Sequence, residues 1–460
     1  MKTRILILTI SVILFATTVY SQKTEATRLL EEQNKQFIPE IFQITENVHF
    51  AVGYEVSNIA MIEGETGIII IDAGMSPVRM ETLRLKFREI TDKPIKGIII
   101  THGHGDHFGG VQAFLDEGSN PQVWGRSGAL GNNVGFNIEE NAGKSAGLTY
   151  QNNRGARQAG VILPDSIHIN NGIAPRPNKQ NTMFNRKKGQ AEFEPTHFFS
   201  GERKQINIDG IKFDLVAASG ETYDNMYVWM PDQKILFCGD TFYKSFPNLY
   251  TIRGSQYRDV KSWYESIDKM VAEEPVYLLP GHTRPVIGKE KVNEILSNYS
   301  AAIKFVFDKT IEGMNKGLTP DQLVEYVKLP EHLASLPYLT EYYGRVDWGV
   351  RSIFNGYLGW FDGNPVNLNK LAPKSEAEKM AIMVGGKDKL RANALKAFKD
   401  EDFQWAAQLS DYLLALNIND KEIINLKADA LFEIAKTMVT ATGRNYMNSY
   451  AIQLKEKVGE

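Results

Sequence analysis

The segment Thr101–His107 constrains this chain more than any other part of its sequence. It reads Thr-His-Gly-His-Gly-Asp-His, follows the apolar run Ile98–Ile100, and holds three of the 8 histidines. Four potential metal ligands therefore share one loop: His102, His104, Asp106 and His107. The glycine between the first two histidines lets both imidazoles turn to one cation, and these ligand types suit zinc. A polar loop that is rich in histidine by chance is the alternative, which such clustering disfavours.

The composition sets the scale of the fold and disfavours one class of partner. With 460 residues, of which 43% are hydrophobic, the chain is long enough for about three domains with large cores. The 52 basic residues nearly balance the 55 acidic ones, and no basic run stands out. We therefore expect no nucleic-acid partner.

The first 21 residues have the pattern of a signal peptide. Lys2 and Arg4 precede an apolar stretch at 5–19, and Ser21 stands at the expected cleavage position. The stretch is short for a helix that crosses a bilayer, which needs about 20 apolar residues. We expect a periplasmic or secreted protein with no membrane anchor after the leader is removed.

Residues 41–300 alternate between strand-like and helical patterns. Runs of β-branched residues bounded by turn formers predict strands, and apolar residues between 77 and 90 have helical spacing. The expected strands lie at 48–52, 58–62, 67–71, 206–208, 211–216, 226–230, 234–237 and 276–279. The irregular stretch 125–201 favours a functional loop or lid. Two β-rich units with interspersed helices predict an α/β fold, an αββα sandwich.

Beyond residue 300 the pattern becomes helical. Apolar spacings of three and four predict helices at 290–316, 320–328, 345–360, 376–398, 401–416 and 420–440. The last three resemble stacked helical hairpins. We predict a domain at 22–300 that carries the site and an all-α domain at 301–460.

Three polar residues that follow later strands complete a candidate metal centre. Glu221, Asp240 and His282 each come shortly after an apolar run. Each taken alone is more often a cap or turn residue. Their succession after the histidine-rich loop instead favours a centre with two ions.

The order of these motifs resembles the metallo-β-lactamase superfamily, whose fold is the αββα sandwich. The matching features are a strand followed by Asp72, the segment Thr101–His107, Asp240 and His282. Most of that superfamily has histidine where this chain has Glu221, and glutamate there is characteristic of its alkylsulfatase branch. That branch usually has glutamate in place of Asp240.

Two later regions also resemble the alkylsulfatase branch. Pro247–Gly254 is similar to its sulfate-side motif, and Tyr343–Trp348 with Gly356–Pro365 is similar to its helical dimerisation domain. The resemblance covers about residues 40–440 and implies a homodimer formed through the helical domain. We expect no counterpart of the sterol-carrier-like domain that commonly ends the branch. Four aromatic residues are either core or part of the dimer surface: Trp348, Tyr357, Trp360 and Phe361.

The resemblance also divides the metal ligands between two zinc ions. One ion is held by His102, His104 and Glu221, the other by Asp106, His107 and His282, and both by Asp240. A water whose pKa these ions lower is the expected nucleophile, which gives Asp106 and Asp240 a catalytic role. Asp72 either accepts the second N–H of a histidine ligand or caps the turn before Gly74.

An anionic sulfate ester needs a fixed cation beside such a centre. Arg253 fits as a catalytic and substrate-binding residue, because a guanidinium donates two parallel hydrogen bonds to sulfate oxygens. Asn248 adds a neutral donor. A buried ion pair is the alternative for Arg253, and Arg258 fits either role equally. Neighbouring aromatic residues line an alkyl channel or belong to the core: Phe242, Tyr243, Phe246 and Tyr250.

We predict a metal-dependent hydrolase of the alkylsulfatase type that cleaves small sulfate esters, in particular linear alkyl sulfates. A related hydrolase of phosphoesters, lactones or β-lactams that uses the same centre is one alternative. A metal-dependent binding protein without turnover is another, which the complete set of ligands disfavours.

Overall fold

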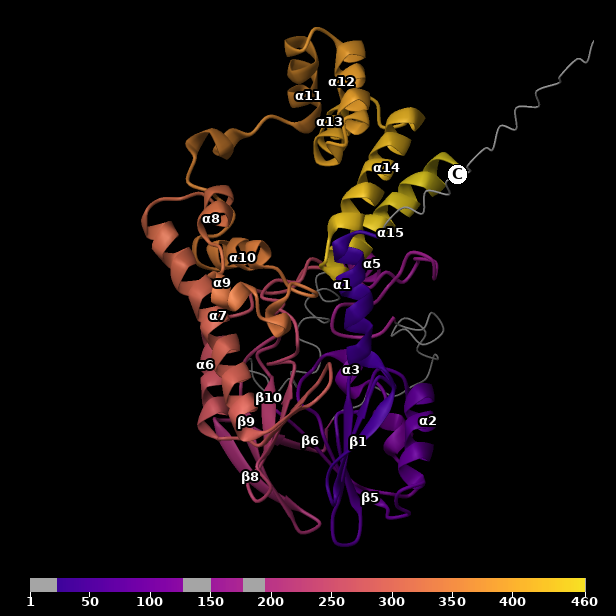
Figure 1. Ribbon diagram of the computed structural model, residues 1–460, viewed down its shortest axis with the longest axis vertical. Coiled ribbons are helices and arrows are strands. Elements are labelled where there is room, and N and C mark those ends of the chain that lie inside the picture. The colour runs from indigo at the N-terminus through magenta and orange to yellow at the C-terminus, as the bar shows by residue number, and fades with distance from the viewer. Residues whose placement is uncertain (1–22, 127–149, 177–194, 460) are drawn as a thin grey trace, which may run out of the picture.

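Two β-sheets pack face to face between two layers of helices in the computed structural model (Figure 1). The structure describes residues 23–126, 150–176 and 195–459. The predicted leader and parts of the irregular stretch 125–201 lie outside these ranges. None of the helices within them is long and apolar enough to cross a membrane. The predicted αββα sandwich is confirmed.

The first sheet contains seven strands in chain order, antiparallel from β1 to β4 and parallel from β4 to β7. They are β1 (Glu40–Thr45), β2 (Val48–Val52), β3 (Ile59–Glu63), β4 (Ile68–Ile71), β5 (Ile95–Ile99), β6 (Gln122–Arg126) and β7 (His197–Phe199). Helix α2 (Pro77–Arg88) covers the outer face, where Met80, Leu83 and Phe87 are buried against the sheet. Central strands such as β4 are apolar throughout because both of their faces are covered.

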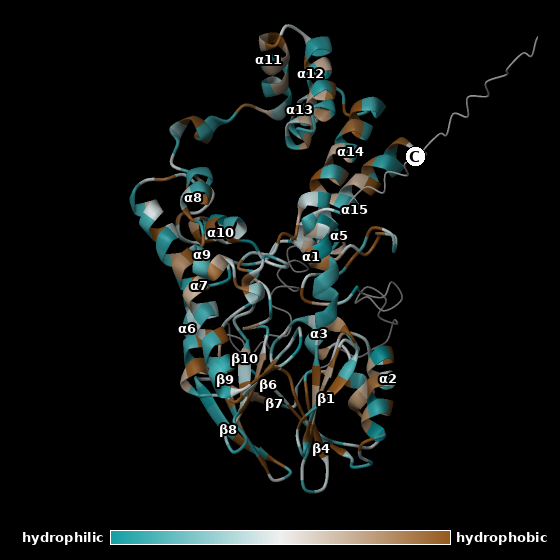
Figure 2. Ribbon diagram, in the orientation of Figure 1, coloured by the Kyte–Doolittle hydropathy of each residue, from teal (hydrophilic) through white to brown (hydrophobic). Residues whose placement is uncertain are grey.

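The second sheet contains six strands in the order β13-β12-β11-β10-β9-β8, with one parallel pair, β11 and β12. They are β8 (Arg203–Ile208), β9 (Ile211–Ala217), β10 (Met226–Met230), β11 (Ile235–Gly239), β12 (Tyr277–Pro280) and β13 (Val286–Ile287). Its inner face packs against the first sheet. In Figure 2 the inner part of the sandwich is mainly coloured as hydrophobic, the edge strand β8 is mainly coloured as hydrophilic, and the helices show both colours.

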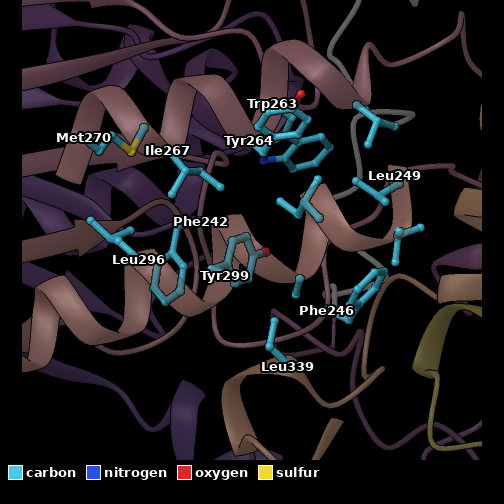
Figure 3. Packing of buried hydrophobic residues seen from close by; sticks show 14 of the residues in the cluster. Phe242, Phe246, Leu249, Trp263, Tyr264, Ile267, Met270, Leu296, Tyr299 and Leu339 are labelled. Atoms are coloured by element: carbon cyan, nitrogen blue, oxygen red, sulfur yellow. The ribbon is translucent and has the colours of Figure 1, made fainter. Parts of the chain in front are cut away.

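Helices α6 (Val260–Ala272) and α7 (Lys289–Asn315) cover the outer face of the second sheet. Trp263 and Ile267 of α6 face Leu296 and Tyr299 of α7 across a buried core (Figure 3). Helix α7 runs without a break through residue 300, so the predicted domain boundary falls inside a helix that packs on the α/β layers. The division at that residue stays a prediction.

Phe242 and Phe246, which follow β11, lie in the same core (Figure 3). Both side chains are fully buried. Of the two alternatives for these residues, the alkyl channel is therefore wrong, because both side chains are buried in one cluster with residues of α6 and α7. They are core residues, as the alternative expected.

The rest of the chain is helical. Its helices are α8 (Pro320–Tyr326), α9 (Glu331–Ala334), α10 (Val346–Leu358), α11 (Pro373–Met383), α12 (Lys387–Lys399), α13 (Phe403–Leu416), α14 (Lys421–Thr437) and α15 (Ala441–Val458). The single helix predicted at 376–398 is two helices, because Gly385 and Gly386 between them have φ angles of 92° and 117°. Helices α11–α13 stand apart from the sheets, whereas α15 returns to α5 (Tyr150–Gln158) beside the N-terminal helix α1 (Glu25–Gln33) (Figure 1).

Candidate metal centre

The candidate ligands lie on loops that leave one edge of the sandwich. β4 and β5 are parallel, as are β11 and β12, so the carboxyl ends of each pair lie at the same edge. Asp72 follows β4, the segment 101–107 follows β5, Asp240 follows β11, and the loop with His282 follows β12. Glu221 follows β9, which runs in the same direction as β11 because β10 is antiparallel to both. The polar residues that follow these apolar strands therefore lie together at one edge of the sandwich.

One half of the centre surrounds His104. Its Nδ1 atom lies 3.0 Å from Nε2 of His102 and 3.7 Å from Oε2 of Glu221. The same Nε2 atom of His102 lies 3.6 Å from Oδ2 of Asp240. Glu221 and Asp240 are each only 2% exposed.

The other half surrounds the second carboxylate oxygen of Asp240. Its Oδ1 atom lies 3.3 Å from Nε2 of His107 and 3.2 Å from Nε2 of His282. Oδ2 of Asp106 lies 3.5 Å from the same nitrogen of His282. Asp240 therefore faces both halves with different oxygens, as a carboxylate that bridges two ions can.

All seven predicted metal ligands are brought together. Their donor atoms form three sets, each within 4.8 Å: His102, His107 and Asp240; Asp106, His107 and His282; His104, Glu221 and Asp240. The second set has the composition predicted for one ion. His102 groups with His107 and Asp240, whereas the prediction joined it to His104 and Glu221. The division of the ligands between two ions stays a prediction.

The outer nitrogen of three histidines is fixed by the surrounding chain. Nδ1 of His107 lies 2.8 Å from Oδ2 of Asp72, and Nδ1 of His282 lies 2.9 Å from the carbonyl of Val56. Nδ1 of His102 lies 3.1 Å from Oγ1 of Thr101. Each Nε2 atom is thereby directed inward as a ligand. The prediction that Asp72 supports a histidine is confirmed.

The donor set fits a metal ion. Nε2 of His107 and Oδ1 of Asp240 are buried, and neither has a hydrogen-bond partner among the described residues. Buried polar atoms of this kind are rare unless a ligand satisfies them. The four imidazoles and three carboxylates of this set are ligand types that zinc accepts.

The charges of the centre are strongly coupled in the metal-free chain. Burial lowers the pKa of His102 well below its ordinary value. Burial also acts against the protonated form of His107, but Asp240 and Asp72 outweigh it and raise the pKa of this imidazole. Burial disfavours the ionised form of Asp240, yet the neighbouring histidines hold its pKa well below the usual range. The carboxylate is thus ionised and ready to bind a cation.

Glu221 has two further partners whose role the sequence did not reveal. The hydroxyl of Tyr243 donates to its Oε1 atom over 2.8 Å, and Nη1 of Arg258 lies 3.0 Å from its Oε2 atom. All three side chains are buried. A buried carboxylate needs such partners, but no local pattern tells which arginine or tyrosine supplies them. Arg258, which fitted two roles equally, is an ion-pair partner.

Arg253 lies beside the metal ligands. Its Nη2 atom is 3.4 Å from Nε2 of His104, and its Nη1 atom donates to Oγ1 of Thr251 over 2.7 Å. Asn248 is joined to the same region, because its backbone N–H donates to the hydroxyl of Tyr243 over 2.8 Å. The amide nitrogen of its buried side chain has no partner among the described residues. A cation and a neutral donor thus accompany the centre.

Comparisons with known proteins agree with this arrangement. Residues 52–282 match the metallo-β-lactamase superfamily, and residues 319–457 match the alkyl sulfatase dimerisation family. The linear primary-alkylsulfatase of Pseudomonas sp. (strain ATCC 19151) is 36% identical over 404 residues, which are 86% of this chain and 74% of that protein. The chain belongs to the alkylsulfatase family. This membership confirms the predicted metal-dependent hydrolase.

Other alkylsulfatases extend the similarity. The alkyl/aryl-sulfatase BDS1 of Saccharomyces cerevisiae is 30% identical over 91% of this chain and 64% of its own length. The structure of the stereoselective inverting sec-alkylsulfatase Pisa1 from Pseudomonas sp. superimposes with a TM-score of 0.83 at 26% identity, and the match covers 94% of this chain and 68% of that one. The fold of the alkylsulfatase family therefore extends over the helical half as well as the sandwich.

Proposed function

We propose that this chain hydrolyses sulfate esters, in particular linear alkyl sulfates, at a centre of two zinc ions, and that it acts as an exported homodimer. The position of Arg253 carries the proposal, because its guanidinium lies 3.4 Å from the predicted metal ligand His104. A planar cation with parallel N–H donors is suited to the oxygens of a sulfate group. The names of the related alkylsulfatases support the same class of substrate.

The residues of the chain have separate tasks in this reaction. Arg253 binds the sulfate group and offsets the charge that develops on it. Asn248 donates from its amide, whose nitrogen is buried without a partner among the described residues. Glu221 and Asp240 add negative charge to the centre, and Arg258 compensates part of it at 3.0 Å from Glu221. The seven ligands would hold two zinc ions, and the chemistry that these ions would supply is a water whose pKa is lowered toward neutrality, the expected nucleophile.

Hydrolysis of three substrates by purified protein of known metal content tests the proposal. Dodecyl sulfate, a phosphodiester and a β-lactam are compared for the wild type, Asp240→Ala and Arg253→Ala. We expect turnover of dodecyl sulfate that both variants lose, with metal content reduced only in Asp240→Ala. Rapid cleavage of the phosphodiester that is insensitive to Arg253→Ala would contradict the proposal and favour another hydrolase of the superfamily. Stoichiometric binding of dodecyl sulfate without turnover would favour the binding protein.

Two further measurements complete the test. Hydrolysis in isotopically labelled water locates the label in the alcohol if the C–O bond breaks and in the sulfate if the S–O bond breaks. Expression of the full chain with a cell fractionation tests the proposed export. The processed protein is expected in the periplasm or the medium, and an unprocessed protein in the cytoplasm would refute this part.

A further inference from the structure

The loop that carries Arg253 is bound along one face of helix α5. Gln151, Arg154 and Gln158 lie at spacings of three and four, so they share that face. The amide of Gln151 donates to the carbonyl of Gly254 over 2.8 Å, and Nε of Arg154 donates to the carbonyl of Ile252 over 3.1 Å. Two residues of this face therefore hold the backbone on either side of Arg253.

Gln158 makes the contact that reaches Arg253 itself. Its Oε1 atom accepts from the backbone N–H of Arg253 over 2.9 Å and from the hydroxyl of Thr251 over 3.0 Å. That hydroxyl in turn accepts from Nη1 of Arg253 over 2.7 Å. The three residues thus form a closed ring of hydrogen bonds. The Thr251 hydroxyl donates its proton to Gln158. A lone pair of Oγ1 of Thr251 therefore accepts the hydrogen bond from the guanidinium of Arg253.

Two of the three members of the ring are buried, and only Arg253 carries a charge. Thr251 is fully buried and Gln158 is 7% exposed. A carboxylate in place of the amide would pair with the arginine and cancel the charge that an anion needs, whereas the amide oxygen orients the guanidinium and leaves its charge intact. Such support is what holds a binding residue in a productive geometry.

Helix α5 is itself anchored on α15. The guanidinium of Arg157 lies 4.9 Å from the ring centroid of Tyr450, and its Nε atom donates to Oε1 of Gln453 over 2.8 Å. Ser449 of α15 donates to the carbonyl of Arg157 over 3.3 Å. One side of α5 therefore contacts the helical part of the chain, and the other side contacts the Arg253 loop.

We infer that Gln158 is a positioning residue for sulfate binding, which acts by orienting Arg253 through Thr251 from the anchored helix α5. This inference rests on the proposed function, in which Arg253 binds the sulfate group.

The test measures sulfate binding by the metal-loaded full chain. Gln158→Met removes the acceptor oxygen at nearly unchanged length, and Thr251→Val removes the hydroxyl on the other side of the ring. Asn152→Ala, an exposed position of the same helix, is the control. Calorimetry gives the dissociation constant of inorganic sulfate, and kinetics with dodecyl sulfate separate KM from kcat. Metal content and melting temperature are recorded for each variant.

We expect both ring variants to raise the dissociation constant of inorganic sulfate and the KM by about 5- to 20-fold, the usual effect of lost hydrogen bonds to a charged group. The value of kcat changes less, and metal content and the control variant match the wild type. Adding Gln158→Met to Arg253→Ala has no further effect. Wild-type sulfate binding in Gln158→Met, or an equal loss in the Arg253→Ala background, overturns the inference. If the single variant Arg253→Ala binds sulfate as the wild type does, the proposed role of Arg253 in sulfate binding is wrong. This result refutes the proposed function itself and is distinct from wild-type binding in Gln158→Met.

Discussion

Nη1 of Arg258 lies 3.0 Å from Oε2 of Glu221, and the two side chains are 1% and 2% exposed. Arg258 thus places a buried cation beside Glu221, a predicted metal ligand. Most of the superfamily that this sequence resembles has histidine at this position. The additional negative charge of glutamate is therefore compensated within the protein, so the centre as a whole does not become strongly anionic.

Arg258→Met is expected to lower the free energy of unfolding of the metal-free protein by about 3 kcal/mol, because it leaves a buried carboxylate unpaired. The double variant with Glu221→Gln should recover most of this loss, since neither charge remains. Urea unfolding in the presence of a chelator measures both. Lys396→Met is the control, because its ion pair with Asp400 is exposed and such pairs contribute less than about 1 kcal/mol. Equal losses in Arg258→Met and the control would contradict the buried pair.

Removal of the metal ions is expected to lower the stability of the folded chain. A ligand at about 1,000 times its dissociation constant stabilises the native state by about 4 kcal/mol, and the buried Nε2 of His107 and Oδ1 of Asp240 lose their partner without it. Melting temperatures before and after chelation, and after zinc is restored, measure the effect. Asp240→Asn should melt at the same temperature with and without zinc. An identical melting temperature for metal-free and zinc-loaded wild type would refute the metal centre.

The metal ligands could be predicted because their signal is local. His102, His104 and His107 stand within one glycine-rich loop, and Asp240 and His282 directly follow apolar strands. Parallel strands then bring such loop residues to one edge without any further information.

The residues that support these ligands could not be predicted, because their contacts join distant segments. Gln158 and Arg253 are 95 positions apart, and nothing near either residue in the sequence indicates the other. Helix α15 escaped prediction for a related reason. Its buried face includes Arg444, Asn445 and Asn448, so it has no apolar periodicity.

Two other differences between the predicted and the observed helices had signals in the sequence: helix α6, which was not predicted, and the break between α11 and α12. Val260, Trp263, Ile267 and Met270 have the spacing of a buried helical face, which is α6. The pair Gly385 and Gly386 is a helix stop that divides the helix predicted at 376–398. Both patterns are present in the sequence. In the second case, the helical spacing on both sides of the two glycines favoured one continuous helix over a helix stop.

Acid is expected to destabilise the contact between the α5 region and α15 through His168. Burial lowers the pKa of this imidazole to about 4, and its Nδ1 atom is buried without a hydrogen-bond partner among the described residues. The unfolded chain binds this proton near pH 6.5. The contribution of the neutral imidazole to the free energy of unfolding is therefore complete above pH 6.5 and is lost as the pH falls toward 4. The loss is about 3 kcal/mol.

Unfolding of the chelated protein at pH 7 and pH 4.5 measures this effect. In His168→Gln the amide can still donate to the carbonyl of Ala159, which lies 3.1 Å from Nε2 of the imidazole, and it does not titrate. The variant should therefore lose less stability than the wild type between the two pH values. The same loss in both proteins would show that other groups account for the acid sensitivity.

The apolar surface around Trp360 is expected to be the dimer contact. Trp360 is 73% exposed and Val366 is 74% exposed, and neighbouring residues add to this surface: Tyr357, Leu358, Leu368 and Leu371. Large apolar side chains exposed together along one segment indicate an interaction site, and this segment lies within the region that matches the alkyl sulfatase dimerisation family. Of the four aromatic residues that fitted either role, Trp360 belongs to the surface, whereas Trp348 packs on Gly443.

The double variant Trp360→Glu with Val366→Glu is therefore expected to be monomeric at micromolar concentration, at which we expect the wild type to be a dimer. An anchor residue at an interface contributes about 2 kcal/mol or more, which is about a 30-fold change in the dissociation constant. Light scattering after size exclusion measures the mass. Val78→Glu changes a valine of α2 that is 66% exposed, and because α2 and α10 lie on opposite sides of the molecule in Figure 1 this variant should remain dimeric. A dimer that survives the double variant would place the contact on another face of the helical region.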